Sequence, residues 1–141
     1  MSLFPPGPLL SGGAAELFAH ARVVYLGTVS PGGEPHVVPI SPILDLDRVV
    51  FASEFATVHV RNIREDPRVS LTVDEYHEDW DRLRAVMVFG PAQIIESGFE
   101  WERMRNLLYE KFPQYPEQSP IEEGTTAMLD IRIDRIVTWG F

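Results

Sequence analysis

Short apolar stretches separated by turn residues run through the first half of the chain, and this pattern restricts the possible folds more than any other feature. Residues 23–29 and 35–40 are apolar and rich in valine, and the five residues between them read SPGGE. Proline and glycine at this spacing predict a turn between the two strands of a β-hairpin. A third apolar stretch at residues 49–52 follows Asp45 and Asp47, so we expect three antiparallel strands in a meander.

The rest of the chain adds further strands and a few helices. Alternating apolar and polar side chains, typical of half-buried strands, occur at residues 69–74 and at residues 129–134, where a last strand runs towards Trp139. A longer strand is expected at residues 85–95, with an interruption at Gly90 and Pro91. Helical patterns occur at residues 14–21, at residues 57–62, and from Ser97 onwards, where Ser97 and Glu100 have the spacing of a capping box. These elements predict a mainly β protein with α-helices (α+β class), built as a six-stranded antiparallel barrel with peripheral helices.

Length, charge and composition exclude several classes of protein. The 141 residues fit one domain, and we expect a proline-rich arm at residues 1–12 and a single domain at residues 13–141. A net charge of −9 opposes nucleic-acid phosphates and anionic membrane surfaces, so neither is expected as a partner. The chain has no cysteine, no apolar run long enough to span a membrane and no signal-peptide pattern. We therefore expect a cytoplasmic protein whose redox chemistry, if any, would need a bound cofactor.

The helix expected at residues 57–62 carries the strongest candidate binding site. Thr57 can cap the helix, the amides of the first turn could bind a phosphate, and Arg61 could neutralise its charge. An ordinary cap and a solvated arginine would explain the same two residues, since such caps are common in any protein.

Other candidates lie outside this helix. His36 in the second strand could hydrogen-bond a ligand or act as an acid or base, and Arg22 could enter a groove between strand ends. Trp80 with Arg84 could cover a flat ring, because an aromatic plane beside a guanidinium suits such a ligand. Each of these residues also has a purely structural explanation. The acidic loop at residues 74–81 contains His77, but it matches neither the helical HExxH pattern nor an EF-hand loop, so no metal site is expected.

Several segments, taken in order, resemble the pyridoxamine 5′-phosphate oxidase-like flavin-binding split barrel. They are residues 22–29, 31–39, 49–51, 60–63 and 66–69. Residues 79–83, 112–115 and 135–139 resemble the subgroup of that family assigned to the deazaflavin coenzyme F-420. The resemblance implies a split barrel and a homodimer with two cofactor sites at the subunit interface. The implied cofactor is FMN or, alternatively, F-420.

The resemblance also implies which residues hold the cofactor. Proteins of this family bind the cofactor phosphate at the end of the third strand and in the following helix, here Ser53, Thr57, His59, Arg61 and Asn62. The second strand would lie along the ring system and the partner subunit would reach across, which adds His36, Pro39, Ser41, Trp80 and Arg84. Many members carry a lysine where this chain has His59, and a neutral histidine would weaken the phosphate contact.

The implied function is a flavin- or deazaflavin-dependent oxidoreductase that acts on an unidentified small molecule. The cofactor ring carries the hydride in such enzymes, so no catalytic side chain is assigned. The segment that grips the pyridoxal ring in true pyridoxamine phosphate oxidases has no counterpart before Phe141, and vitamin B6 oxidation is not expected. Two alternatives stay open. One is a non-catalytic dimer that binds or sequesters FMN or F-420, and the other is a dimeric interaction domain in which Arg61 and Trp80 are structural.

Overall fold

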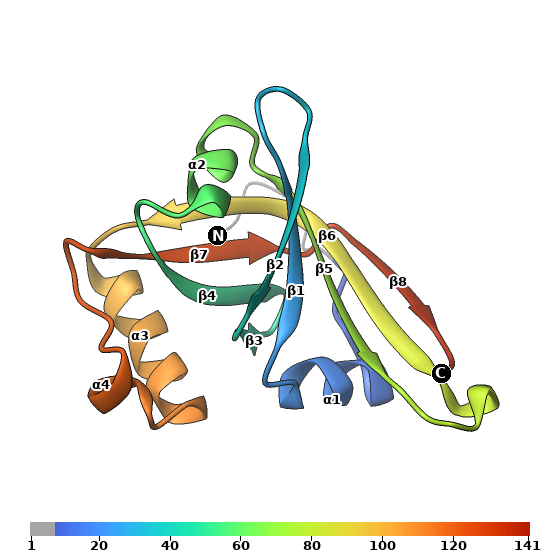
Figure 1. Ribbon diagram of the computed structural model, residues 1–141. Coiled ribbons are helices and arrows are strands. Elements are labelled where there is room, and N and C mark those ends of the chain that lie inside the picture. The colour runs from blue at the N-terminus through green and yellow to red at the C-terminus, as the bar shows by residue number, and fades with distance from the viewer. Residues whose placement is uncertain (1–7) are drawn as a thin grey trace.

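A computed structural model describes residues 8–141 of the chain, so most of the arm expected at residues 1–12 lies outside the described residues. The elements follow one another as α1 (Gly12–His20), β1 (Val24–Val29), β2 (Pro35–Ile40), β3 (Ile43–Asp45), β4 (Arg48–Glu54), α2 (Val58–Glu65), β5 (Arg68–Glu75), η1 (Trp80–Arg82), β6 (Arg84–Ile95), α3 (Phe99–Lys111), α4 (Tyr115–Gln118), β7 (Thr126–Arg132) and β8 (Arg135–Trp139) (Figure 1). None of the described helices is long and apolar enough to cross a membrane.

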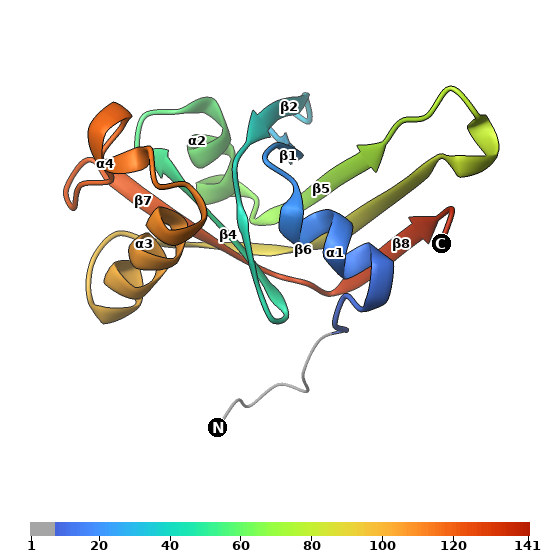
Figure 2. The same ribbon diagram turned by 90° about the horizontal axis from the view of Figure 1, so that it is seen from below.

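The strands form one antiparallel sheet that curls into a half-barrel, which confirms the predicted fold class (Figure 2). The order along the sheet is β2-β1-β5-β6-β7-β4-β3, with β8 paired to β6. Strand β6 belongs to both halves of the sheet. Residues 84–91 pair with β5, residues 85–89 also pair with β8, and residues 92–95 pair with β7. The helices lie outside the sheet, with α3 and α4 together at one end.

The predicted hairpin is confirmed, whereas the predicted three-stranded meander is wrong. β1 and β2 pair over their full lengths, and Gly33 adopts φ 84° in the turn between them. β4 pairs with β3 and β7 rather than with β2. Pro35 and Pro39 lack an amide hydrogen, and a strand that contains such residues is confined to the edge of a sheet. The chain therefore leaves β2 and begins the other half of the barrel.

Two more strands are present in the described residues than the six expected. β3 is only three residues long, and the segment predicted as a single last strand is divided into β7 and β8. The division falls where the backbone amides of Ile133 and Asp134 donate to the carbonyl oxygens of Asp47 and Phe89, at 3.0 and 2.8 Å. These bonds direct the chain from one half of the sheet to the other.

The predictions of alternation in the last strand and of a capping box were also wrong. β7 is buried on both faces, because the main core covers one face and α3 packs over the other. Asp130, which was expected to face water, is therefore buried. Arg48 Nη1 donates to Asp130 Oδ2 at 2.5 Å, yet burial still raises the pKa of that carboxyl. At the start of α3 the cap is Gly98 with φ 99°, and the Glu100 carboxylate pairs with Arg103 instead of reaching back.

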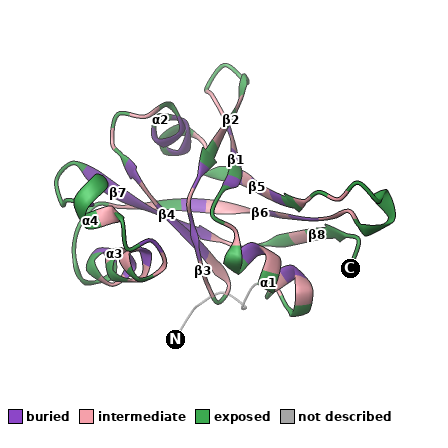
Figure 3. Ribbon diagram, turned by 60° about the horizontal axis from the view of Figure 1, so that its bottom comes forward, coloured by how far each residue is buried: buried purple, intermediate pink, exposed green. Residues whose placement is uncertain are grey.

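Two apolar clusters stabilise the half-barrel. The larger lies inside the curl, where Leu26, Phe51 and Leu71 from both halves are fully buried and Phe18 of α1 closes one side (Figure 3). The smaller lies between α3 and the outer face of β4 and β7 and includes Val50, Trp101, Met104, Leu108 and Met128. Trp101 Nε1 donates to the Thr126 carbonyl oxygen at 3.0 Å, which satisfies the one polar atom of this buried ring.

Gly90 should be essential at the point where β6 passes from one half to the other. A Cβ at this position would overlap the carbonyl oxygen of Arg132, and backbone cannot move aside as a flexible side chain can. We expect Gly90→Ala to lower the free energy of unfolding by about 3 kcal/mol or more. Urea denaturation checks this. Gly32→Ala is the matched control, since its Cβ would meet only Ser30 Oγ at 3.9 Å. Equal stabilities of the two variants would contradict the close approach.

Candidate functional site

The sequence around α2 folds so that polar groups gather at the start of the helix. Thr57 is the N-cap, and its hydroxyl accepts from the amide of Val60 at 3.4 Å, as predicted. Val60 and Ile63 point into the main core and seat the helix against β1 and β6. The remaining first-turn amides have no acceptor within the helix, because helical geometry leaves them free. The N-terminus of α2 therefore offers donors beside the end of β4.

Three side chains make a hydrogen-bonded chain at this point. Ser53 Oγ lies 2.7 Å from His59 Nε2 and 3.0 Å from Thr57 Oγ1. Ser53 and His59 are each only 9% exposed, so the chain is largely shielded from water. The His59 ring lies near the Phe51 ring, with centroids 5.9 Å apart. The structure thus brings together three of the five residues proposed to contact a phosphate.

Burial favours the neutral form of His59 more than exposure to water would. Desolvation lowers the pKa of His59, and the nearby His36 on β2 lowers it further. Among residues 8–141, no carboxylate contributes to the shift. His36 Nδ1 is itself buried and has no hydrogen-bond partner among residues 8–141. The site therefore contains two imidazoles near each other, one of which has a free nitrogen.

The other two helix residues play different roles. Asn62 Nδ2 donates to Thr28 Oγ1 at 3.0 Å, and both side chains are buried between α2 and β1. Asn62 thus ties the helix to the sheet. Arg61 is exposed, and among the described residues its side chain makes no hydrogen bond or ion pair. Its guanidinium remains available for an anion at the same helix.

Two other candidates, Pro39 on β2 and Ser41 after it, lie outside this cluster. Pro39 is exposed and pairs with Tyr25 across the hairpin. Ser41 follows β2 and lines a hollow of about 190 Å³ together with Phe112 and Tyr115. Within a single subunit, these two residues therefore do not extend the polar group at α2.

Trp80 belongs to η1 and Arg84 is the first residue of β6, so both lie at the tip of the arm that β5 and β6 form. Figures 1 and 2 show this arm extending away from α2. Trp80 is 72% exposed, and its Nε1 donates to the Tyr76 hydroxyl at 3.4 Å. Arg84 Nε donates to Glu75 Oε2 at 2.5 Å and its guanidinium lies 5.1 Å from the centroid of the Phe141 ring. Arg84 first and His77 second hold the pKa of Glu75 below its usual value. A single subunit does not bring this pair to the α2 cluster.

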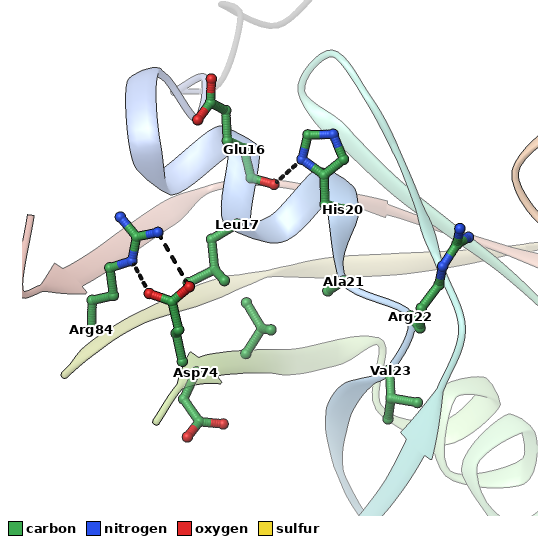
Figure 4. A pocket seen from close by; sticks show the side chains of 10 residues that line it. Glu16, Leu17, His20, Ala21, Arg22, Val23, Asp74 and Arg84 are labelled. Carbon is green, nitrogen blue, oxygen red and sulfur yellow. Dashed lines mark hydrogen bonds and ion pairs between the residues drawn. The ribbon is translucent and has the colours of Figure 1, made fainter. Parts of the chain in front are cut away.

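Arg22 borders a second cavity and belongs to the framework. The cavity has a volume of about 430 Å³ between α1 and the strands, and Figure 4 shows Arg22 and Arg84 on opposite sides of it. Arg22 Nη1 donates to the Lys111 carbonyl oxygen at 2.9 Å. Lys111 Nζ in turn donates to the carbonyl oxygens of Ala21 and Pro42, and burial together with Arg22 lowers its pKa to about 8. The chain's single lysine was not singled out by the sequence patterns.

The sequence patterns also missed an apolar face on the outside of the sheet. Register places Tyr25, Val37, Met87, Val137 and Trp139 on the face that points away from the main core, and we call these residues the outer apolar face. Val37 is 68% exposed and Tyr25 is 50% exposed. Consecutive apolar residues in a strand, as at residues 23–26, are the signal for a sheet that is covered on both faces.

Known proteins share this architecture. The sequence pattern of the family described as pyridoxamine 5′-phosphate oxidase matches residues 11–140. The chain belongs to this family. A 5a,11a-dehydrotetracycline/5a,11a-dehydrooxytetracycline reductase of Streptomyces rimosus subsp. rimosus is 30% identical to it over 120 residues, which cover 82% of this chain and 72% of that protein. The family membership confirms the resemblance inferred from the sequence segments.

Solved structures agree on the fold of this family member. A conserved hypothetical protein from Mycobacterium tuberculosis superposes with a TM-score of 0.76 at 22% identity, covering 93% of this chain and 86% of that one. An F420 reductase superposes with a TM-score of 0.73 at 19% identity, covering 91% and 98%. At these identities the likeness concerns the fold alone.

The buried amide of Asn62 should matter for stability, whereas Arg61 should not. Asn62→Ala removes the hydrogen bond to Thr28 and leaves a buried hydroxyl without that partner, which costs about 1–3 kcal/mol of the free energy of unfolding. Arg61→Ala on the same helix should leave the free energy of unfolding unchanged. Thermal and urea denaturation of both variants check this. A stable Asn62→Ala protein would show that the tie between α2 and β1 is dispensable.

Proposed function

We propose that the protein is a homodimeric oxidoreductase that binds FMN, or alternatively the deazaflavin F-420, with the cofactor phosphate at the start of α2. The observation that carries this proposal is the hydrogen-bonded chain of Ser53, Thr57 and His59 beside the first-turn amides. Hydroxyl, imidazole and amide groups at a helix N-terminus suit an anion, and the exposed Arg61 adds a positive charge. The donor set therefore fits a phosphate group.

The relatives support oxidoreductase chemistry. The Streptomyces rimosus relative and one solved structure with this fold are both named as reductases. In the proposed enzyme the cofactor ring supplies hydride transfer to or from a small molecule. The chain's own residues then bind, orient and exclude water. Ser53 and Thr57 position the phosphate, His36 lies where the second strand would follow the cofactor, and the core beneath α2 holds these groups rigid.

The outer apolar face supports the homodimer. A face that carries Tyr25, Val37 and Trp139 toward water is unfavourable in a lone subunit and favourable once a second copy covers it. In this arrangement the partner subunit could bring an arm equivalent to β5, η1 and β6 to the cofactor. Trp80 and Arg84 would then act across the interface and not within one chain.

The dimer can be tested by placing a charge on the outer apolar face. We expect Val37→Glu to yield a monomer, because the carboxylate would be buried without a partner in the dimer. Sedimentation equilibrium measures the mass directly. Phe99→Glu is the control, since Phe99 is 79% exposed at the start of α3 and is not part of this face. A wild-type protein that sediments as a monomer would refute the dimer.

Cofactor binding is tested by titrating the purified protein with FMN, F-420 and riboflavin, which lacks the phosphate. We expect binding of FMN or F-420, and we expect Arg61→Ala to weaken it by about tenfold while riboflavin binding stays unchanged. Arg64→Ala is the matched control on the same helix, since Arg64 pairs with Glu96. Binding of none of the three ligands would overturn the proposed function. Oxidation of the reduced cofactor by added acceptors then distinguishes an enzyme from a carrier.

A further inference from the structure

We propose that His59 is a proton-dependent phosphate ligand: its ring is neutral in the free protein and takes up a proton when the cofactor phosphate binds. This inference rests on the proposed function and concerns how the same site holds its ligand. It assigns to His59 the positive charge that a lysine at this position would carry permanently. Cofactor affinity would then depend on pH in a way that a lysine site would not.

The geometry makes His59 the buried group that can respond to a phosphate. Its Nε2 is 2.7 Å from Ser53 Oγ, and Ser53 Oγ is 3.0 Å from the cap hydroxyl of Thr57. The ring is thus joined through one hydroxyl to the helix start where the phosphate would lie. An imidazolium donates from both nitrogens, whereas a neutral ring donates from only one. Protonation therefore adds both a charge and a donor to this chain.

The surroundings of the ring disfavour a charge until an anion arrives. Burial lowers the pKa of His59 first, and the second imidazole, His36 on β2, lowers it further. The nearest apolar ring is that of Phe51. Among the described residues, no carboxylate contributes to this shift.

The charged groups on the surrounding elements do not replace a bound anion. α2 itself carries the exposed Arg61, Arg64 and Glu65, and the end of β4 carries the exposed Glu54. β1 and β6 also pack on α2. Their titratable side chains are Tyr25, which lies on the outer apolar face, and Arg84, which is the first residue of β6 at the tip of the β5–β6 arm. A phosphate at the helix start would therefore be the first negative group to act on the ring directly.

The direction of the pH dependence follows from this arrangement. A bound phosphate raises the pKa of His59 above its value in the free protein. The contact is then fully present below the free-protein pKa and is lost as the pH rises through the bound-state pKa. Between the two values, binding takes up one proton. The FMN phosphate itself becomes more negative as the pH rises through about 6, which would strengthen its binding while the His59 contact weakens. The test therefore requires a control for the charge of the phosphate.

The test combines a direct measurement on the wild-type protein with a charge control. NMR titration of the histidine ring signals should show a higher His59 pKa with FMN bound than with riboflavin bound or with no ligand. FMN dissociation constants of the wild type and of His59→Lys are measured from pH 5.5 to 8.5. The ratio of the wild-type constant to that of His59→Lys should rise by about tenfold across this range. The lysine variant stays charged, so the ratio removes the titration of the phosphate.

Each result has a definite meaning. An unchanged His59 pKa on binding FMN, or equal pH profiles for the wild type and His59→Lys, would overturn the proton-dependent contact while leaving cofactor binding intact. Failure to bind FMN, F-420 and riboflavin at every pH would overturn the proposed function itself. His59→Gln, which cannot be charged, should bind FMN at pH 6 about tenfold more weakly than the wild type.

Discussion

The long strand β6 is the constraint on which the rest of the structure depends. It is shared by the two halves of the half-barrel, and at Gly90 it passes so close to the Arg132 carbonyl that no side chain fits between them. Because of this crossing, β5 pairs with the first part of β6 and β7 pairs with its last part. The sheet is therefore curved, and its concave side holds the larger apolar cluster. The crossing also determines where α2 sits, because that helix packs on β1 and β6 together.

The site at α2 combines two requirements that usually conflict. The helix is held by apolar packing through Val60 and Ile63, and in the proposed function its first turn must also keep donors free for a ligand. Ser53, Thr57 and His59 are hydrogen-bonded to one another beside this first turn, which is where we propose that a phosphate binds. Desolvation keeps the histidine neutral, so this group stores no uncompensated charge in the free protein.

Local sequence signals predicted the elements better than their pairing. The SPGGE turn, the Thr57 cap and the strand at residues 69–73 involve residues close in the chain, so turn chemistry, capping and alternation identify them. The meander, the capping box at Ser97 and the alternation near Asp130 failed for other reasons. For the meander and the alternation a distant element decides the outcome, since β7 pairs with β4 and α3 buries the second face of β7. The capping box failed locally, because α3 begins one residue later than expected and Gly98 is its cap.

The sequence by itself determined the fold class and the set of donors beside α2, because these depend on residue types at short spacings, and the family through the order of the segments that resemble it. Only the tertiary structure decided which of those residues meet. It joins Ser53 and His59, commits Asn62 to Thr28, and separates Trp80 and Arg84 from the rest by the length of the β5–β6 arm. The physical reason is that contact and desolvation depend on where distant strands and helices pack, and no local pattern records that arrangement.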